Sequence, residues 1–229
     1  YLNDYMMTDW QKKYEGTTCI NFIDGGDDLG ASAKFWFADA QEDGVYLTFD
    51  DDLIADKGYV GYLADSAYKY PNSIVGLHGT VYNKWPVQSY YLDPNRSVTY
   101  CYGGNPSDKP VHMLGSGCMA FRVNMESAPT IKDFPAPNMT DPYIYKWAAS
   151  KKKSLVCLNR LSGFVKEQAE SQGTAIWKGL LKSCTVQTNL INSVKASLRK
   201  AETIGGKSYG GASLEWSHFK QILSVIGKK

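Results

Sequence analysis

Short hydrophobic runs alternate with longer amphipathic segments along the first two thirds of the chain. Two short runs, at residues 19–23 and 45–49, are β-branched and aromatic and are bounded by Gly or Asp, which predicts strands there; further strands are predicted at residues 73–77 and 154–158. The amphipathic segments predict helices at residues 31–40, 57–70 and 141–151. This alternation predicts an α/β sheet flanked by helices.

The pattern changes in two places. Between residues 81 and 121, short aromatic segments (89–91 and 98–102) are separated by Pro and Gly turns, which predicts antiparallel hairpins added to the main sheet. Helices are predicted at 187–200 and 214–226, with a mobile glycine-rich loop at 204–211 between them. We therefore expect one domain over residues 1–229, with a core at 1–160 and a C-terminal helical extension and mobile loop at 161–229.

Composition narrows the class of protein. A net charge of +2 on 229 residues offers no case for nucleic acid as a partner. The five cysteines are odd in number and lack CxxC spacing, which argues against structural zinc and a disulfide framework and favours a reducing, cytoplasmic location. No apolar run approaches the roughly 20 residues of a membrane span.

An acidic triplet, Asp50-Asp51-Asp52, ends the predicted strand at 45–49. Like charges that gather where a strand leaves the core call for a counter-charge. Carboxylate oxygens suit Mg²⁺ or Mn²⁺, and these ions often bridge to substrate phosphates. A solvated turn, or an Asp52 cap on a helix beginning near Leu53, explains the triplet equally simply.

Further motifs surround the triplet in a definite order. Residues 28–35 precede it, and residues 74–79, 112–122 and 140–143 follow it. In this order they resemble glycosyltransferases of the GT-A fold, close to the family 2 type, over residues 1–160. Residues 174–177 and 187–192 look similar to the tails of bacterial members.

The resemblance implies a GT-A (Rossmann-like) nucleotide-sugar-binding domain, with a mixed central sheet flanked by helices. Residues 1–5 look like the second strand of such a domain, so its first βα unit, on the order of 30 residues, would be missing. The implied activity is transfer of a sugar from a nucleotide-sugar donor, preferably a UDP-sugar, to a glycan or another hydroxyl acceptor. Mn²⁺ or Mg²⁺ would bridge the diphosphate and stabilise it as it leaves.

The resemblance also assigns roles within the triplet. Asp50 and Asp52 would form the DxD pair, with Asp52 as the direct metal ligand and Asp50 reaching the ribose or the metal's water shell. Asp51 would point to the other face by strand alternation, where it would contact the sugar or be structural. His112 is the preferred third metal ligand among three histidines, with a framework histidine as the equally simple alternative.

Other donor contacts follow from the same resemblance. Asp28 and Lys34 would help hold the base, ribose or diphosphate, unless Asp28 is a helix N-cap and Lys34 lies on a solvated face. Gly115, Ser116 and Gly117 would form the loop under the donor sugar, because small residues allow close backbone approach. A plain tight turn is the alternative for this loop.

Asp141 stands where inverting members carry the catalytic base, although Thr140 replaces the first residue of the family's usual acidic pair. An acceptor hydroxyl needs such a base for direct displacement. Asp141-Pro142 is also an ordinary helix start, with Asp as N-cap and Pro at N1. Arg160 or Lys166 could move onto the diphosphate, although surface solvation is the simpler interpretation of each.

Two tryptophans are candidate acceptor contacts, and two other functions are alternatives to the glycosyltransferase. Trp85 and Trp147 could stack on acceptor sugar, but core packing is the commoner role. A sugar nucleotidyltransferase would share the α/β layout and the acidic metal site, but no Gly-rich basic signature is visible near the first residues. A non-catalytic glycan-binding or scaffold domain of the same fold is favoured by the missing unit and disfavoured by the intact aspartates.

Overall fold

The computed structural model describes residues 27–36, 38, 44–123, 128–168 and 183–194, together with residues 9, 179 and 181. Several predicted features lie outside these residues: the strand at 19–23, the segments at 1–5 and 174–177, the loop at 204–211 and the helix at 214–226.

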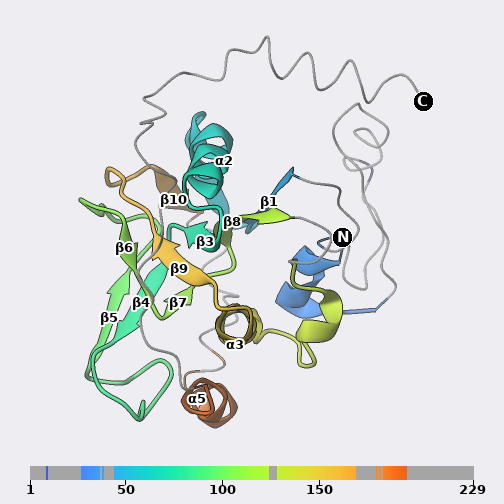
Figure 1. The fold of residues 1–229 in the computed structure, drawn as a ribbon, viewed down its shortest axis with the longest axis vertical. Coiled ribbons are helices and arrows are strands. Elements are labelled where there is room, and N and C mark those ends of the chain that lie inside the picture. The colour runs from blue at the N-terminus through green and yellow to red at the C-terminus, as the bar shows by residue number, and fades with distance from the viewer. Residues whose placement is uncertain are drawn as a thin grey trace.

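A mixed five-stranded sheet forms the centre of the molecule (Figure 1). Its order is β1 (Gly44–Phe49), β8 (Cys118–Val123), β3 (Ser73–Gly76), β9 (Ser154–Cys157) and β6 (Lys109–Pro110). Strands β3 and β9 are parallel, β8 runs antiparallel to both β1 and β3, and β6 runs antiparallel to β9. The strands predicted at 45–49, 73–77 and 154–158, and the mixed α/β character, are confirmed.

Helices cover both faces of this sheet. Helix α2 (Tyr59–Lys69) packs on β1, β3 and β8, while α3 (Thr140–Ser150) packs on β7 and β9 and is in turn covered by α5 (Thr185–Asn192). These helices confirm the predictions at 57–70 and 141–151, and the first part of the prediction at 187–200, since α5 ends at Asn192 and residues 193 and 194 are not helical. A helix was predicted at 31–40, but the structure has the short 3₁₀ helix η1 (Gly30–Phe35) there; a second one, η2 (Ile131–Asp133), precedes α3.

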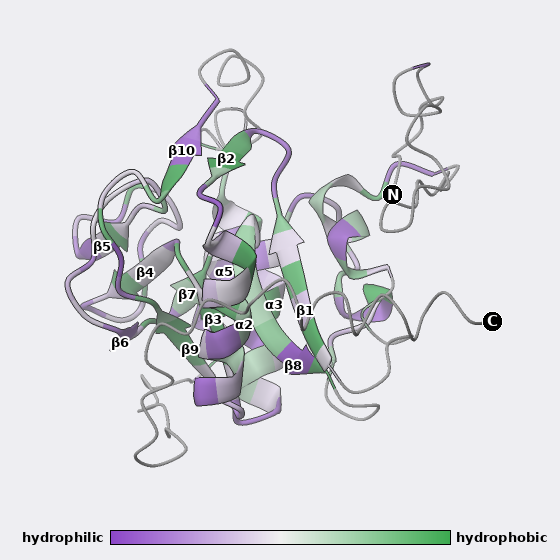
Figure 2. Cartoon of the chain, turned by 90° about the horizontal axis from the view of Figure 1, so that it is seen from above, coloured by the Kyte–Doolittle hydropathy of each residue, from purple (hydrophilic) through white to green (hydrophobic). Residues whose placement is uncertain are grey.

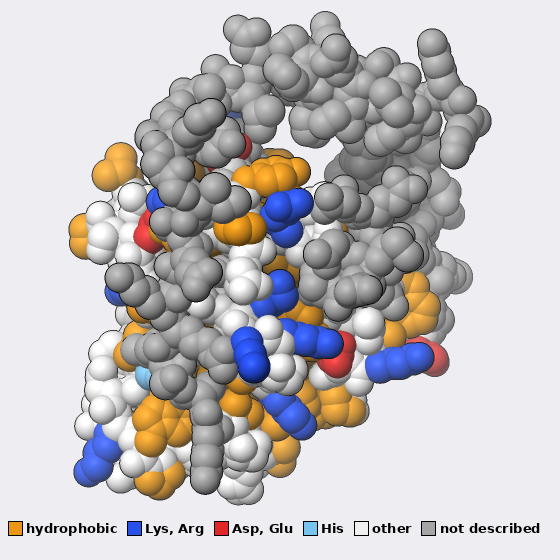
Figure 3. Space-filling model, viewed as in Figure 1, with side chains coloured by type: hydrophobic (Ala, Val, Ile, Leu, Met, Phe, Trp, Pro, Cys, Tyr) orange, Lys and Arg blue, Asp and Glu red, His pale blue; other side chains and the backbone are white. Residues whose placement is uncertain are grey.

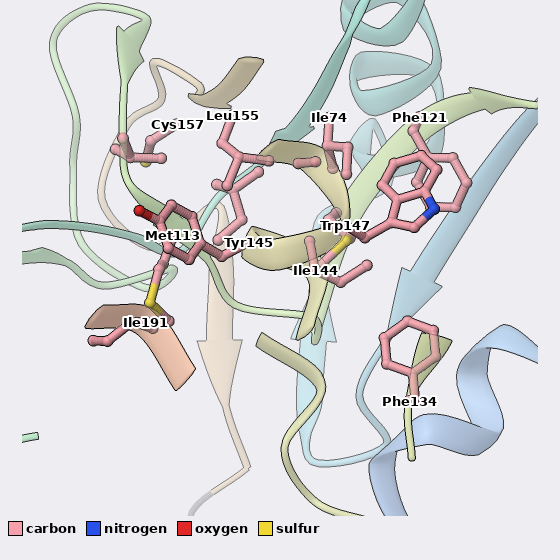
Figure 4. Packing of buried hydrophobic residues seen from close by; sticks show 14 of the residues in the cluster. Ile74, Met113, Phe121, Phe134, Ile144, Tyr145, Trp147, Leu155, Cys157 and Ile191 are labelled. Carbon is pink, nitrogen blue, oxygen red and sulfur yellow. The ribbon is translucent and has the colours of Figure 1, made fainter. Parts of the chain in front are cut away.

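Strand alternation builds two separate cores. Ile74 and Phe121 face the cluster beneath α3, whereas Val75 and Ala120, their neighbours in sequence, face the cluster beneath α2. Figure 4 shows Trp147 among the labelled side chains of the first cluster, where it is 5% exposed. Trp147 therefore packs in the core and is not a surface on which an acceptor sugar could stack.

Two smaller sheets flank the centre. Strands β4 (Gly79–Tyr82), β5 (Arg96–Thr99) and β7 (Met113–Leu114) form an antiparallel sheet, which confirms hairpins within residues 81–121, although 89–91 is irregular. Strand β2 (Leu53–Ala55) pairs with β10 (Val165–Glu167). Since a strand begins at Leu53, the alternative of a helix capped by Asp52 is wrong.

Polarity follows this layering. Figure 2 shows hydrophobic residues on the central strands β3 and β9 and hydrophilic residues on β10. On the face drawn in Figure 3, Lys and Arg side chains are interspersed with hydrophobic and other polar ones. Within the described part of the chain, no helix is long and apolar enough to cross a membrane.

Candidate functional site

Most of the candidate functional residues lie at one edge of the central sheet, where β1 and β3 end and β8 begins. Because β8 is antiparallel to β1 and β3, its first residue lies at the same edge as their carboxyl ends. The backbone N–H of Asp50, just after β1, donates to the Gly117 carbonyl at 3.0 Å, and the Gly115 N–H donates to the His78 carbonyl at 2.9 Å. Carboxyl ends of strands are the usual position for ligands in α/β sheets.

The aspartate triplet forms the turn between β1 and β2. A hydrogen bond of 3.3 Å from the Leu53 N–H to the Asp50 carbonyl closes this turn. None of the three residues belongs to a strand, so the alternation argument that turned Asp51 to the other face is wrong; Asp51 is exposed in the turn. Its predicted contact with the sugar stays a prediction.

Asp52 is half-buried within this cluster of negative charge. Burial, and then the neighbouring charges of Asp50 and Asp51, raise the pKa of Asp52. The carboxylates therefore repel one another in the folded protein, as the sequence predicted. A cation bound beside Asp52 would relieve this repulsion.

Lys34 supplies one positive charge to the cluster. Its ammonium group, from the last turn of η1, lies 2.5 Å from Asp50 Oδ1. The structure thus brings Lys34 to the triplet. Asp28 is exposed, and its carboxylate accepts the Gly30 N–H at 2.8 Å at the start of η1, whose N-cap is Leu29. The predicted contacts of Asp28 and Lys34 with the donor stay predictions.

The loop of residues 115–117 packs tightly against the other groups of this edge. A side chain at Gly115 would meet the Cβ of His78 at 3.0 Å, and one at Gly117 would lie 2.6 Å from Asp50 Cγ. The two glycines therefore allow other groups to lie close to the backbone of this loop. The groups that do so in this structure are the side chains of His78 and Asp50. The carbonyl of Ser116, which is buried, accepts the Thr48 hydroxyl at 2.6 Å.

Asp141 reaches this loop from the first turn of α3. The helix begins at Thr140 with Met139 as N-cap, so the prediction of Asp141 as the cap is wrong. Its Oδ1 instead accepts the Ser116 N–H at 2.8 Å, a bond unavailable to a capping side chain. Burial raises the pKa of Asp141, and the charge of Asp50 adds to this, while hydrogen bonds from Ser116 and the charge of His78 oppose it.

His112 has the framework role that was the alternative to metal binding. Its Nδ1 accepts the Tyr82 N–H at 3.0 Å, and its ring lies 5.5 Å from that of Trp85, edge to face. Burial lowers the pKa of His112, which favours the neutral ring with its proton on Nε2. Neither nitrogen then offers a free lone pair to a metal, and His112 lies directly before β7, where its own N–H donates to the Thr80 carbonyl of β4.

His78 is the histidine that lies at the acidic edge. It follows β3, contacts Gly115, and its charge lowers the pKa of Asp141 and opposes the rise in the pKa of Glu167. Sequence reasoning passed over His78, although its position directly after a buried strand was a usable signal.

Glu167 is a further carboxylate that sequence reasoning missed. It pairs with Leu53 across the β2–β10 sheet, so it lies next to the triplet. Burial, and then the charges of Cys101 and Asp52, raise the pKa of Glu167. No local signal marked Glu167, because its position depends on pairing between segments more than 100 residues apart.

Arg160 is neither a free surface residue nor aimed at a diphosphate. Its guanidinium group donates to the carbonyls of Cys101, Tyr100 and Leu158 at 3.0, 2.5 and 2.8 Å. It therefore anchors the loop after β5. Lys166 is exposed on β10, and Trp85 keeps 36% of its surface exposed.

The carboxylates at this edge form an incomplete set of metal ligands. Among the described residues, no group of three Asp, Glu, His or Cys side chains is arranged to hold a metal ion. Mg²⁺ usually keeps several waters and is held by one or two carboxylates together with substrate phosphates. Asp50 and Asp52 fit a divalent ion of this kind, held jointly with a diphosphate.

Comparison with known proteins adds no assignment. No protein-family model matches the chain, and no curated protein matches it. The edge itself presents an acidic turn, a tight glycine loop and the half-buried carboxylate of Asp141 behind that loop.

Proposed function

We propose that this chain is a metal-dependent, inverting glycosyltransferase of the GT-A type that transfers a sugar from a UDP-sugar to a hydroxyl group of a glycan or similar acceptor. One observation carries the proposal. Asp50 and Asp141 approach the 115–117 loop from β1 and from α3, and the charge of Asp50 adds to the rise in the pKa of Asp141. A candidate metal-binding pair and a candidate base thus lie at one edge of a mixed α/β sheet.

The donor half of the site is the triplet with Lys34. Asp52 and Asp50 would hold Mn²⁺ or Mg²⁺ with the diphosphate, and the ion would stabilise the negative charge that the leaving group gains. The Lys34 ammonium group, paired with Asp50 at 2.5 Å, adds positive charge where the phosphates would lie. Two carboxylates, one of them already paired with Lys34, supply only part of the ion's ligands, so metal and nucleotide should bind together.

The acceptor half of the site is Asp141. Hydrogen bonds from Ser116, among them its N–H to Oδ1 at 2.8 Å, hold the carboxylate that would accept the proton. The acceptor oxygen would attack the anomeric carbon as the bond to the diphosphate breaks, and its proton would pass to Asp141. The raised pKa of Asp141 makes it a stronger base than an ordinary carboxylate.

The test begins with binding. We expect UDP with Mn²⁺ to raise the melting temperature more than either alone, and Asp52→Asn to abolish the difference. Asp56→Asn is the matched control, because Asp56 is an exposed carboxylate four residues away that accepts the Gly58 N–H.

A panel of nucleotide sugars then reports the chemistry. We expect metal-dependent release of UDP from at least one UDP-sugar, reduced at least about tenfold by Asp52→Asn. Asp141→Asn should keep UDP–Mn²⁺ binding and lower transfer to an acceptor by about 100-fold or more. The proposal fails if Asp52→Asn binds UDP and Mn²⁺ as the unmodified chain does.

A further inference from the structure

Two tyrosine rings lie exposed and stacked in the loop that follows β5. Tyr100 is 49% exposed and Tyr102 is 38% exposed. Their ring centroids are 5.3 Å apart and their planes differ by 12°, so the two rings stack on each other with nearly parallel planes, and the exposed surface of this pair is here called the Tyr100–Tyr102 platform. Adjacent aromatic rings left on the surface are typical of a binding site.

The backbone of this loop, and not its rings, carries the anchoring contacts. Arg160 donates to the carbonyls of Tyr100 and Cys101, and the Gly163 N–H donates to the carbonyl of Tyr102 at 3.0 Å. Truncation of either ring leaves these bonds in place. The platform can therefore be tested by mutation without releasing the loop.

The platform borders the acidic edge on two sides. The ring of His78 meets that of Tyr100 edge to face, at 5.5 Å and 89°, and the charge of His78 acts on Asp141. On the other side, the charge of Glu167 adds to burial in raising the pKa of Tyr102, and Glu167 also interacts with Asp52. A ligand lying on the rings would thus lie beside His78, which contacts the 115–117 loop, and near Glu167, which pairs with Leu53 next to the triplet.

We propose that the Tyr100–Tyr102 platform is the acceptor subsite and binds the apolar face of a pyranose ring of a neutral glycan. This inference rests on the proposed function, since an acceptor subsite presupposes transfer at the neighbouring acidic edge. A pyranose presents C–H groups on its face, which pack on aromatic rings, and hydroxyl groups at its rim. Glu167, whose charge acts on Tyr102, would accept hydrogen bonds from such hydroxyls.

Binding of simple glycosides tests the platform. The probes are the methyl glycosides of glucose, galactose, mannose and N-acetylglucosamine, followed by saturation-transfer NMR and titration on the whole chain. We expect at least one to bind, with affinity about tenfold weaker in Tyr100→Ala and in Tyr102→Ala. Tyr68→Ala is the matched control, because Tyr68 is 47% exposed on α2, and it should bind as the unmodified chain does.

Titration of UDP with Mn²⁺ into the same variants separates the two proposals. Unchanged UDP affinity with weakened glycoside binding supports the acceptor subsite. Weakened UDP affinity would show that the rings stack on the nucleotide base, and this result would overturn the acceptor subsite. The acceptor subsite is also overturned if none of the glycosides binds. If glycosides bind through the rings but UDP and Mn²⁺ do not bind, the platform stands as a glycan site and the transferase proposal fails.

Discussion

The contact between Gly117 and Asp50 gives the sharpest test of how the acidic turn is positioned. An alanine Cβ at residue 117 would lie 2.6 Å from Asp50 Cγ and 3.3 Å from its Cβ, with the carboxylate oxygen closer still. Two carbon atoms cannot approach to 2.6 Å, so in Gly117→Ala the Asp50 carboxylate must rotate away. That rotation breaks its ion pair with Lys34 at 2.5 Å.

The cost to folding should be small and the cost to binding large. The Lys34 and Asp50 side chains are 22% and 36% exposed, and an ion pair so open to solvent contributes about 0–1 kcal/mol. For a chain of this size, a loss of about 1 kcal/mol lowers the melting temperature by about 2–4 °C. Loss of one contact from a charged group to the ligand costs about 1.5–3 kcal/mol, or about 10- to 100-fold in UDP–Mn²⁺ affinity.

Calorimetric titration and thermal denaturation measure the two effects together. Gly58→Ala is the control, because a Cβ there would have its nearest neighbour, Asp56 Oδ1, at 3.6 Å. The control should melt within a few degrees of the unmodified chain and bind equally well. If Gly117→Ala binds UDP with Mn²⁺ as tightly as the control, Asp50 does not hold the ligand in this position and the reasoning is refuted.

Three further outcomes follow. Burial raises the pKa of Asp141, so the folded state binds this proton more tightly than the unfolded state does. The stability of the fold therefore falls as the pH rises from about 4 through the raised pKa. Asp141→Asn should raise the melting temperature at pH 7, and the difference from the unmodified chain should vanish near about pH 3. His112→Ala should cost about 1–3 kcal/mol of stability, because it leaves the Tyr82 N–H unpaired. It should not weaken the binding of UDP with Mn²⁺. A loss of that binding would show that His112 is a metal ligand. Arg160→Lys should lower the melting temperature by several degrees, because one ammonium group cannot reproduce three hydrogen bonds to carbonyls, and an unchanged melting curve would contradict its anchoring role.

Local pattern predicted the elements whose side chains face the two cores. Residues 45–49 and 73–77 could be recognised as strands because their β-branched and aromatic residues meet both faces of a covered sheet. Helix α2 could be recognised from its apolar stripe, with Tyr59 and Leu63 buried. Residues 89–91 resemble a strand, but the Asp93 carboxylate accepts the Gln88 and Asn95 N–H groups and folds this segment into a turn.

The site was predictable as far as its motifs are local. The triplet, Lys34 and the 115–117 loop could be named from the sequence, and the structure brings them together. The choice of histidine depends on pairing between β3 and β8, which places His78 at the edge, and between β4 and β7, which fixes His112 elsewhere. Such long-range pairing leaves no trace in the residues beside either histidine.

Calorimetric titration of UDP into the unmodified chain, with and without Mn²⁺ and beside Asp52→Asn, tests the central claim most directly. The account predicts that UDP binds measurably only when Mn²⁺ is present, and that Asp52→Asn removes this binding while Asp56→Asn does not. Binding of UDP that ignores the metal, or that survives in Asp52→Asn, would contradict it.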